Sequence, residues 1–176
     1  MNIRSGINPD TATEYIKSNY RKEEKMYKKL LFGTCLTEYC DYIFNFALNM
    51  AFENNAKLWI YHGLGRLDLS EEETTKKIKD IETHMVEAYS ERMKNRGFTD
   101  YMINVSDGDQ VDKMSDLAKN ADIDAIIIGT STKTPLEVGE GPASGSLGDT
   151  SAEMILKAPC SVIVVPPSLL PGLATG

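Results

Sequence analysis

A polar, glycine-containing segment follows a buried hydrophobic run near position 129, and its residue types could bind an anion. The run Asp124–Ile128 is aliphatic after its first residue and is followed directly by Gly129 and Thr130. In open parallel sheets, ligands bind beyond the carboxyl ends of the strands, where the free N–H groups of a helix N-terminus attract phosphates. A helix is expected from about Thr150. Gly129 and Thr130 after the hydrophobic run, with Thr150 at the helix start, are therefore candidate ligand-binding residues.

Cys35 lies at the end of another predicted strand and could act as a nucleophile or in redox chemistry. A reactive cysteine needs a pKa lowered by a nearby cation or helix N-terminus. A helix begins shortly after Cys35, but the sequence places no His or Lys beside it. A small buried apolar side chain is therefore the favoured interpretation, and Cys40 and Cys160 are expected to face the core or a crossover. His62 and His84 are too far apart in sequence to argue for a metal site.

Motifs of known catalytic chemistry are missing from the sequence. The serine in Gly141–Gly145 does not have the spacing of a nucleophile elbow, and there is neither a Gly-x-Gly-x-x-Gly sequence nor a Walker lysine. We therefore expect no enzymatic activity beyond, at most, slow ATP hydrolysis if a nucleotide is bound.

Composition restricts the possible classes of protein. The chain has 176 residues, of which 41% are hydrophobic and 26% charged, as expected for a soluble globular domain. A net charge of −7 argues against nucleic-acid binding, which needs clustered positive charge. No apolar run approaches the roughly 20 residues that span a bilayer. The first residues lack a secretory pattern, so we expect a cytoplasmic protein.

Strands and helices are predicted to alternate along the chain, which indicates right-handed crossovers and a doubly wound parallel α/β sheet. A capping box at Ser70–Glu73 opens the second helix, Arg96-Gly97 ends it, and Asp109 caps the third. The predicted strands cover residues 27–34, 57–62, 101–105, 125–128 and 161–165, and the first and last helices cover about 38–53 and 150–157.

Three regions are expected. Residues 1–26 form an N-terminal helical extension, which Asn8-Pro9-Asp10 would start, and residues 27–166 form the domain. Residues 167–176 form a flexible C-terminal tail, because prolines at 166 and 167 cannot continue a central strand.

Several local patterns follow one another along the chain. They are a strand, turn and Ala-containing helix at 30–51, a strand ending in His62, and the sequence Asp107-Gly108-Asp109 before a helix. The last is Ile-Ile-Ile-Gly129 followed by Gly148 and then Ala158–Val165. From about residue 28 to 166 the chain thus resembles the universal stress protein family. The resemblance implies a five-stranded sheet of order 3-2-1-4-5, homodimerisation through the last strand, Ser161–Val165, and either a nucleotide-binding or a non-binding branch.

The sequence departs from the family's ATP-binding pattern at several positions. Cys35 falls where those members carry an acid, and Gly63 falls at an adenine-side position that is usually aliphatic. Gly129 matches the first phosphate-loop glycine, but Thr132 replaces the second and its β-branched side chain obstructs close approach of a phosphate. Asp149 replaces the hydroxyl residue after Gly148, where it could cap the helix. A carboxylate there would cost a bound phosphate about 1–4 kcal/mol.

We therefore expect a regulatory binding protein of the stress response that does not bind ATP in the family's usual way. The alternative is a nucleotide-binding member with a divergent phosphate loop, formed by the insertion 133–147. ATP with magnesium would then be the cofactor, with Ser144, Ser146 or Thr150 supplying contacts. A third hypothesis is an enzyme that uses Cys35 and Asp149, which only their positions support.

Overall fold

The computed structural model describes residues 25–130 and 147–166. The expected helix in the N-terminal extension, Thr132 with most of the insertion, and the tail from 167 lie outside these residues. Within the described part of the chain, no helix is both long and apolar enough to cross a membrane.

Within the described ranges, five strands alternate with four helices, as the sequence predicts there, and the predicted strand boundaries agree within two residues. The elements are β1 (Lys29–Gly33), α2 (Glu38–Asn54), β2 (Lys57–Gly63), α3 (Glu71–Asn95), β3 (Tyr101–Ser106), α4 (Gln110–Asn120), β4 (Ala125–Gly129), α5 (Asp149–Lys157) and β5 (Ser161–Val165).

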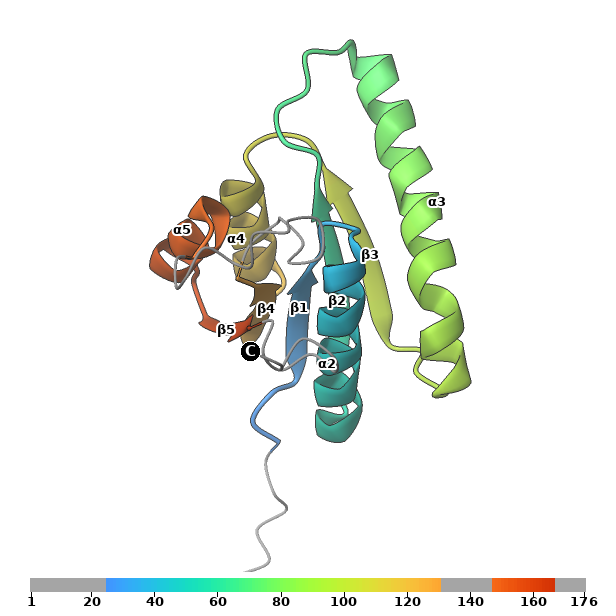
Figure 1. Ribbon diagram of the computed structural model, residues 1–176, viewed down its shortest axis with the longest axis vertical. Coiled ribbons are helices and arrows are strands. Elements are labelled where there is room, and N and C mark those ends of the chain that lie inside the picture. The colour runs from blue at the N-terminus through green and yellow to red at the C-terminus, as the bar shows by residue number, and fades with distance from the viewer. Residues whose placement is uncertain (1–24, 131–146, 167–176) are drawn as a thin grey trace, which may run out of the picture.

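The strands form one parallel sheet of order β3-β2-β1-β4-β5, which confirms the expected fold. From β1 the chain proceeds outward to β2 and β3, and then returns to build β4 and β5 on the other side. Helices α2 and α3 cover one face of the sheet, and α4 and α5 cover the other (Figure 1). The reversal between β1 and β4 is the topological switch point, where ligands bind in such sheets.

Local sequence signals set the helix ends. The Ser70 hydroxyl accepts from the backbone N–H of Glu73, whose carboxylate accepts from the Ser70 N–H, so the capping box forms as predicted. The Asp109 carboxylate accepts from the N–H groups of Val111 and Asp112 at the start of α4. Gly97 follows α3 with a φ of 64°, a conformation that glycine adopts at little steric cost.

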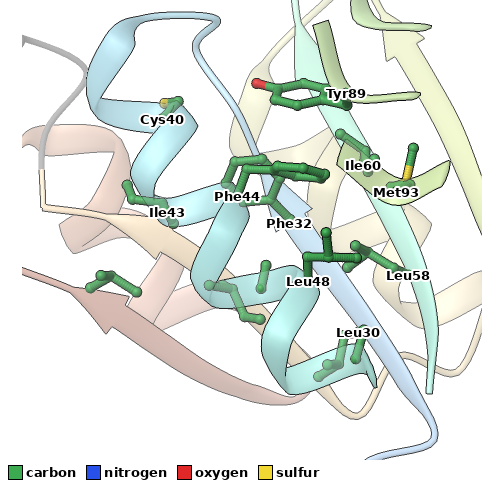
Figure 2. Packing of buried hydrophobic residues seen from close by; sticks show 14 of the residues in the cluster. Leu30, Phe32, Cys40, Ile43, Phe44, Leu48, Leu58, Ile60, Tyr89 and Met93 are labelled. Atoms are coloured by element: carbon green, nitrogen blue, oxygen red, sulfur yellow. The ribbon is translucent and has the colours of Figure 1, made fainter. Parts of the chain in front are cut away.

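Alternate strand residues pack into two hydrophobic clusters, one on each face. This is why β1 and β4 are continuously apolar. The cluster below α2 and α3 contains Phe32, Phe44 and Tyr89, and the ring centroids of Phe44 and Tyr89 lie 4.4 Å apart. Figure 2 shows Cys40 and the Tyr89 hydroxyl at the same end of this cluster. That end lies at the carboxyl ends of the strands.

Candidate ligand pocket at the carboxyl end of the sheet

A pocket of about 360 Å³ lies at the switch point, beyond the ends of β1 and β4. Its volume is within the usual range for small-molecule sites, at the lower end. The lining residues come from the strand ends, the β1–α2 turn, α2, α4 and α5. They are Gly33, Thr34, Cys35, Cys40, His62, Gly63, Gln110, Met114, Ile128, Gly129, Thr150, Ser151 and Met154.

Half of the eight residues predicted from the sequence line this pocket: Cys35, Gly63, Gly129 and Thr150. Thr130, Gly148 and Asp149 lie beside it but do not line it. The Thr130 carbonyl accepts a 2.8 Å hydrogen bond from the N–H of Gly148, which joins the end of β4 to the start of α5. Thr132 lies outside the described residues.

Gly129 has a packing role that the phosphate-loop interpretation did not include. A Cβ atom at this position would lie 2.6 Å from Tyr39 Cε1 and 2.7 Å from Ile43 Cδ1. The Tyr39 hydroxyl donates to the Val165 carbonyl at 2.7 Å and accepts from the Thr130 N–H at 3.2 Å. Tyr39 therefore ties α2 to the ends of β4 and β5, and only glycine leaves room for its ring.

Gly63 is also explained by a neighbouring side chain. A Cβ atom at Gly63 would lie 2.6 Å from Gln110 Cγ. The Gln110 side chain therefore occupies the space that an aliphatic side chain at position 63 would fill, and its amide donates to the Gly63 carbonyl at 2.8 Å. Residues 63 and 110 are far apart in sequence, so no local pattern could indicate that the Gln110 side chain takes the place of a side chain at position 63.

The expectation that Asp149 caps the last helix is wrong. The N-cap of α5 is Gly148, no side chain caps the helix there, and Asp149 is an exposed first residue. Ser151 anchors the first turn instead, because its buried hydroxyl donates to the Gly129 carbonyl at 2.9 Å. The hydroxyl residues Thr150 and Ser151 thus face the pocket, while the carboxylate of Asp149 does not line it.

The favoured interpretation of Cys35 as a small buried apolar side chain is also wrong. Cys35 is half-buried, lines the pocket, and has its Sγ 2.7 Å from Cys40 Sγ and 3.1 Å from Thr37 Oγ1. The hydrogen bond from the Cys40 thiol, assisted by hydrogen bonds from Thr37, lowers the pKa of Cys35 to about 6, although burial opposes this change. The thiolate form of Cys35 is therefore favoured relative to that of an ordinary cysteine.

His62 makes a local hydrogen bond, as the sequence predicted, and this bond joins the ends of β1 and β2. Its Nδ1–H donates to the Thr34 carbonyl at 2.8 Å. Burial lowers the pKa of His62 more than this hydrogen bond raises it. The imidazole in the pocket wall is therefore neutral at pH 7, and its Nε2 is an acceptor.

A second, smaller pocket of about 250 Å³ adjoins the first and shares Gln110 and Thr150 with it. It contains one cationic side chain, Arg66, and two acidic ones, Asp109 and Glu153. Within the described ranges, no cluster of three or more His, Cys, Asp or Glu side chains could hold a metal ion.

Sequence reasoning missed nine residues of the main pocket. Most of them are apolar or small and have no motif that separates a pocket wall from a core. The missed residues are Gly33, Thr34, Cys40, His62, Gln110, Met114, Ile128, Ser151 and Met154. His62 was noted at its strand end but was assigned only a local hydrogen bond. The position of His62 at a strand end near the switch point was the one sequence signal that could have indicated a pocket residue.

Several solved structures with this fold are universal stress proteins. The chain is 20% identical to universal stress protein UspA from Lactobacillus plantarum, with a TM-score of 0.58 over 79% of this chain and 97% of that one. It is 23% identical to a universal stress protein in complex with cAMP, with a TM-score of 0.58 over 80% and 97% of the two chains. A third structure, from Archaeoglobus fulgidus in complex with dAMP, is 18% identical, with a TM-score of 0.55 over 79% and 98%.

Curated protein sequences give no significant match to this chain. The profile of the universal stress protein family matches residues 26–166, which is the whole described sheet with its helices. That match covers most of the sequence and coincides with the parallel sheet of order 3-2-1-4-5. The chain therefore belongs to the universal stress protein family.

Proposed function

We propose that this protein is a ligand-binding regulator whose main pocket takes a nucleoside, alone or as a monophosphate, and does not hold magnesium ATP. The observation that supports this proposal most strongly is the small number of charged groups in the pocket wall. Among its described residues there is no Lys, Arg, Asp or Glu, and the group in it that most readily becomes an anion is the Cys35 thiol, whose pKa is lowered to about 6.

The apolar part of the wall suits a heteroaromatic base. Met114, Met154 and Ile128 contribute apolar side chains, all from the face of the sheet that α4 and α5 cover. Methionine adapts to irregular shapes, and its sulfur makes favourable contacts with aromatic rings. A planar base could therefore be buried here, as in most small-molecule sites, where an apolar surface supplies affinity and a few polar groups fix orientation.

Polar groups of the wall match the hydroxyl groups and ring nitrogens of a nucleoside. The Cys35 thiolate and the Nε2 atom of His62 are acceptors, and Thr150 provides a hydroxyl. The Gln110 amide has a carbonyl oxygen and a second N–H besides the one that it donates to Gly63. Cys35 falls where ATP-binding relatives carry an acid, so a thiolate there would supply a similar negative acceptor.

The charges oppose a triphosphate. A nucleoside placed in the main pocket could direct one phosphate into the adjoining pocket, towards Arg66. Asp109 and Glu153 in that pocket, and the thiolate in the main one, would repel the larger charge of ATP. Two universal stress proteins of the same fold were solved with the monophosphates cAMP and dAMP, which supports this choice of ligand class.

Calorimetric titration of the purified protein with adenosine, AMP and magnesium ATP tests the proposal, after mass spectrometry of the denatured protein has identified any ligand carried through purification. Adenosine or AMP should bind, and magnesium ATP should bind at least ten-fold more weakly. Thr150→Val keeps the side-chain volume and should weaken binding roughly three- to ten-fold through loss of one hydrogen bond. Thr83→Val, on the exposed side of α3, is the matched control and should bind normally. Tighter binding of magnesium ATP, or no binding of any of the three, would overturn the proposal.

We also propose that the protein forms a homodimer through β5. This strand is an edge of the sheet, and an unprotected apolar edge promotes association. Leu156 on the preceding helix is 85% exposed, which adds apolar surface near that edge. Light scattering coupled to size exclusion should give twice the chain mass. Val162→Lys should lower it, and Val86→Lys on α3 should not; a monomeric wild type would refute the proposal.

A further inference from the structure

Two cysteine side chains meet at the pocket wall, one from the β1–α2 turn and one from the first turn of α2. The Sγ atoms of Cys35 and Cys40 lie 2.7 Å apart, and the Cys35 backbone N–H donates to Cys40 Sγ at 3.1 Å. A disulfide has an S–S length of about 2.05 Å. The two sulfurs therefore need to approach by only a fraction of an ångström to bond.

The two thiols differ in exposure, which assigns them different roles. Cys35 is half-buried and lines the pocket, so a small reagent can reach its sulfur. Cys40 is 4% exposed and packs in the cluster of Phe44 and Tyr89. A reagent would therefore react with Cys35 first. The buried Cys40 would then react with the modified Cys35 sulfur.

The surroundings favour the thiolate form of Cys35. Cys40 donates its thiol proton to Cys35, and this interaction raises the pKa of Cys40 while it lowers that of Cys35 to about 6. Thr37 precedes α2 as its N-cap, yet its side chain makes no capping hydrogen bond and lies instead 3.1 Å from Cys35 Sγ. The positive end of the α2 dipole acts in the same direction.

The turn that presents Cys35 is held in an uncommon conformation. Leu36 has a φ of 59°, which is rare for a residue with a large side chain. Its N–H donates to Thr34 Oγ1 at 3.0 Å, and this hydroxyl also contacts the Tyr89 hydroxyl at 2.7 Å. Such backbone strain persists where surrounding contacts enforce it, often at functional sites.

We propose that Cys35 and Cys40 form a reversible dithiol–disulfide switch in the pocket wall, with Cys35 as the attacking thiolate, Cys40 as the resolving thiol and a hydroperoxide as the oxidant. Cys35 Sγ attacks the terminal oxygen of the hydroperoxide; the O–O bond breaks, and the leaving alkoxide or hydroxide takes a proton from water. Cys40 Sγ then attacks the sulfur of the resulting sulfenic acid, and the S–O bond breaks. The departing hydroxide takes the Cys40 proton and leaves as water. Two electrons pass from the thiol pair to the hydroperoxide, and a low-molecular-weight thiol restores the pair by exchange.

Oxidation would change the pocket itself. The disulfide replaces a negative sulfur and a thiol donor with an uncharged bridge, so the wall loses its anion. The bridge would also covalently join the β1–α2 turn to α2. The pocket would thus have two chemical states that differ in charge and rigidity, whatever ligand it binds.

The chain contains an internal control in Cys160. It precedes β5, packs against the cluster below α4 and α5, and does not line the pocket. Burial raises its pKa, the opposite of Cys35. The proposal therefore predicts that one cysteine of three stays reduced.

The test treats the reduced full-length protein with hydrogen peroxide, denatures it in excess iodoacetamide, and measures intact mass and peptide masses. Reduced protein should carry three carbamidomethyl groups, one for each cysteine of the sequence, and oxidised protein only one, on Cys160. Dithiothreitol should restore all three. Cys160→Ser should still form the bridge, Cys40→Ser should stop at a sulfenic acid that dimedone traps on Cys35, and Cys35→Ser should keep its remaining thiols. Retention of all three groups in the wild type, or a bridge that includes Cys160, would overturn the proposal.

A second readout is the pH dependence of Cys35 alkylation in the native protein. At pH 7, a thiol with a pKa of about 6 is roughly 90% thiolate and one with the ordinary value of 9.0 is roughly 1%. A low-pKa thiolate is also a weaker nucleophile, so the net gain in rate is only roughly five-fold. The profile is more decisive: half-maximal rate near pH 6 supports the switch, and half-maximal rate near pH 9 contradicts it.

Discussion

The two ends of the parallel sheet differ in how their polar groups are satisfied. At the amino end, the Asp124 carboxylate accepts hydrogen bonds from the backbone N–H groups of Lys28 and Lys29 at 2.7 and 2.8 Å. The Lys29 ammonium also lies 3.7 Å from Asp122. These contacts join the start of β1 to the start of β4 and leave their groups engaged with one another.

At the carboxyl end, the same two strands separate around a pocket. Leu36 is held at positive φ, no side chain caps α2, and two thiols share a proton beside the opening. Polar groups there also hydrogen-bond to one another, as Ser151 does with Gly129, but they do so around the pocket. The comparison teaches that the amino end is closed by contacts between its own groups, whereas the carboxyl end places reactive groups beside a pocket, as expected for open α/β sheets.

The largest expected effect is that of Gly129→Ala, which tests whether packing also constrains the carboxyl end. The added methyl group would meet Tyr39 and Ile43 and should lower the free energy of unfolding by about 1–3 kcal/mol, measured by urea denaturation. Ile43→Val removes one of the two clashing atoms, so the double variant should lose less than the sum of the single losses. Strict additivity would show that Gly129 is not limited by this contact.

Asp124→Ala should weaken the amino end alone. Loss of the carboxylate leaves two backbone N–H groups without their acceptor, and because the site is exposed the expected loss is about 1–2 kcal/mol. Asp124→Asn keeps an acceptor and should lose less. The pH profile of Cys35 alkylation should stay the same in both variants; a shifted profile would mean that the two ends are coupled.

Tyr89→Phe probes the support beneath the β1–α2 turn. It removes the hydroxyl that lies 2.7 Å from Thr34 Oγ1 and leaves the aromatic packing with Phe44 intact. The expected loss of stability is about 1 kcal/mol. Tyr42→Phe, on the half-buried side of α2, is the matched control, and an equal loss there would remove the case for a specific role of the Tyr89 hydroxyl.

The smallest expected effect is the pH dependence contributed by His62. Burial lowers its pKa in the folded state, so below the ordinary value of 6.5 the unfolded chain binds a proton that the folded one does not. Stability from this group is complete above pH 6.5 and is lost as pH falls through the folded-state pKa. Thermal melts at pH 8 and pH 5.5 should show a smaller loss on acidification for His62→Gln than for the wild type, and an unchanged loss would contradict this assignment.

The fold could be predicted from the sequence because its signals are local or periodic. The run Ser161–Val165 matches β5, and the Ser70–Glu73 pair forms the predicted capping box. Resemblance to a known family supplied the strand order, which local patterns do not contain. The position of the pocket followed from that order, since Gly129 ends β4 and Cys35 follows the adjacent strand β1.

The chemistry of the site could be predicted only in part. Cys35 and Cys40 are five residues apart, and their contact depends on the positive φ of Leu36, which its side chain does not favour. The Gln110 side chain fills the space beside Gly63 across a separation that no pattern spans. Asp149 was expected to cap α5, but the helix begins one residue earlier than such a cap requires.

The most direct test of a reactive thiolate in a ligand pocket is the rate of Cys35 alkylation across pH 5 to 9, with and without saturating adenosine. The rate should be half-maximal near pH 6, remain nearly constant from pH 7 to 9, and fall several-fold when adenosine occupies the pocket, while Cys160 is unaffected. A rate that rises steadily towards pH 9 would contradict the thiolate. A rate that bound adenosine leaves unchanged would contradict its place in the ligand site.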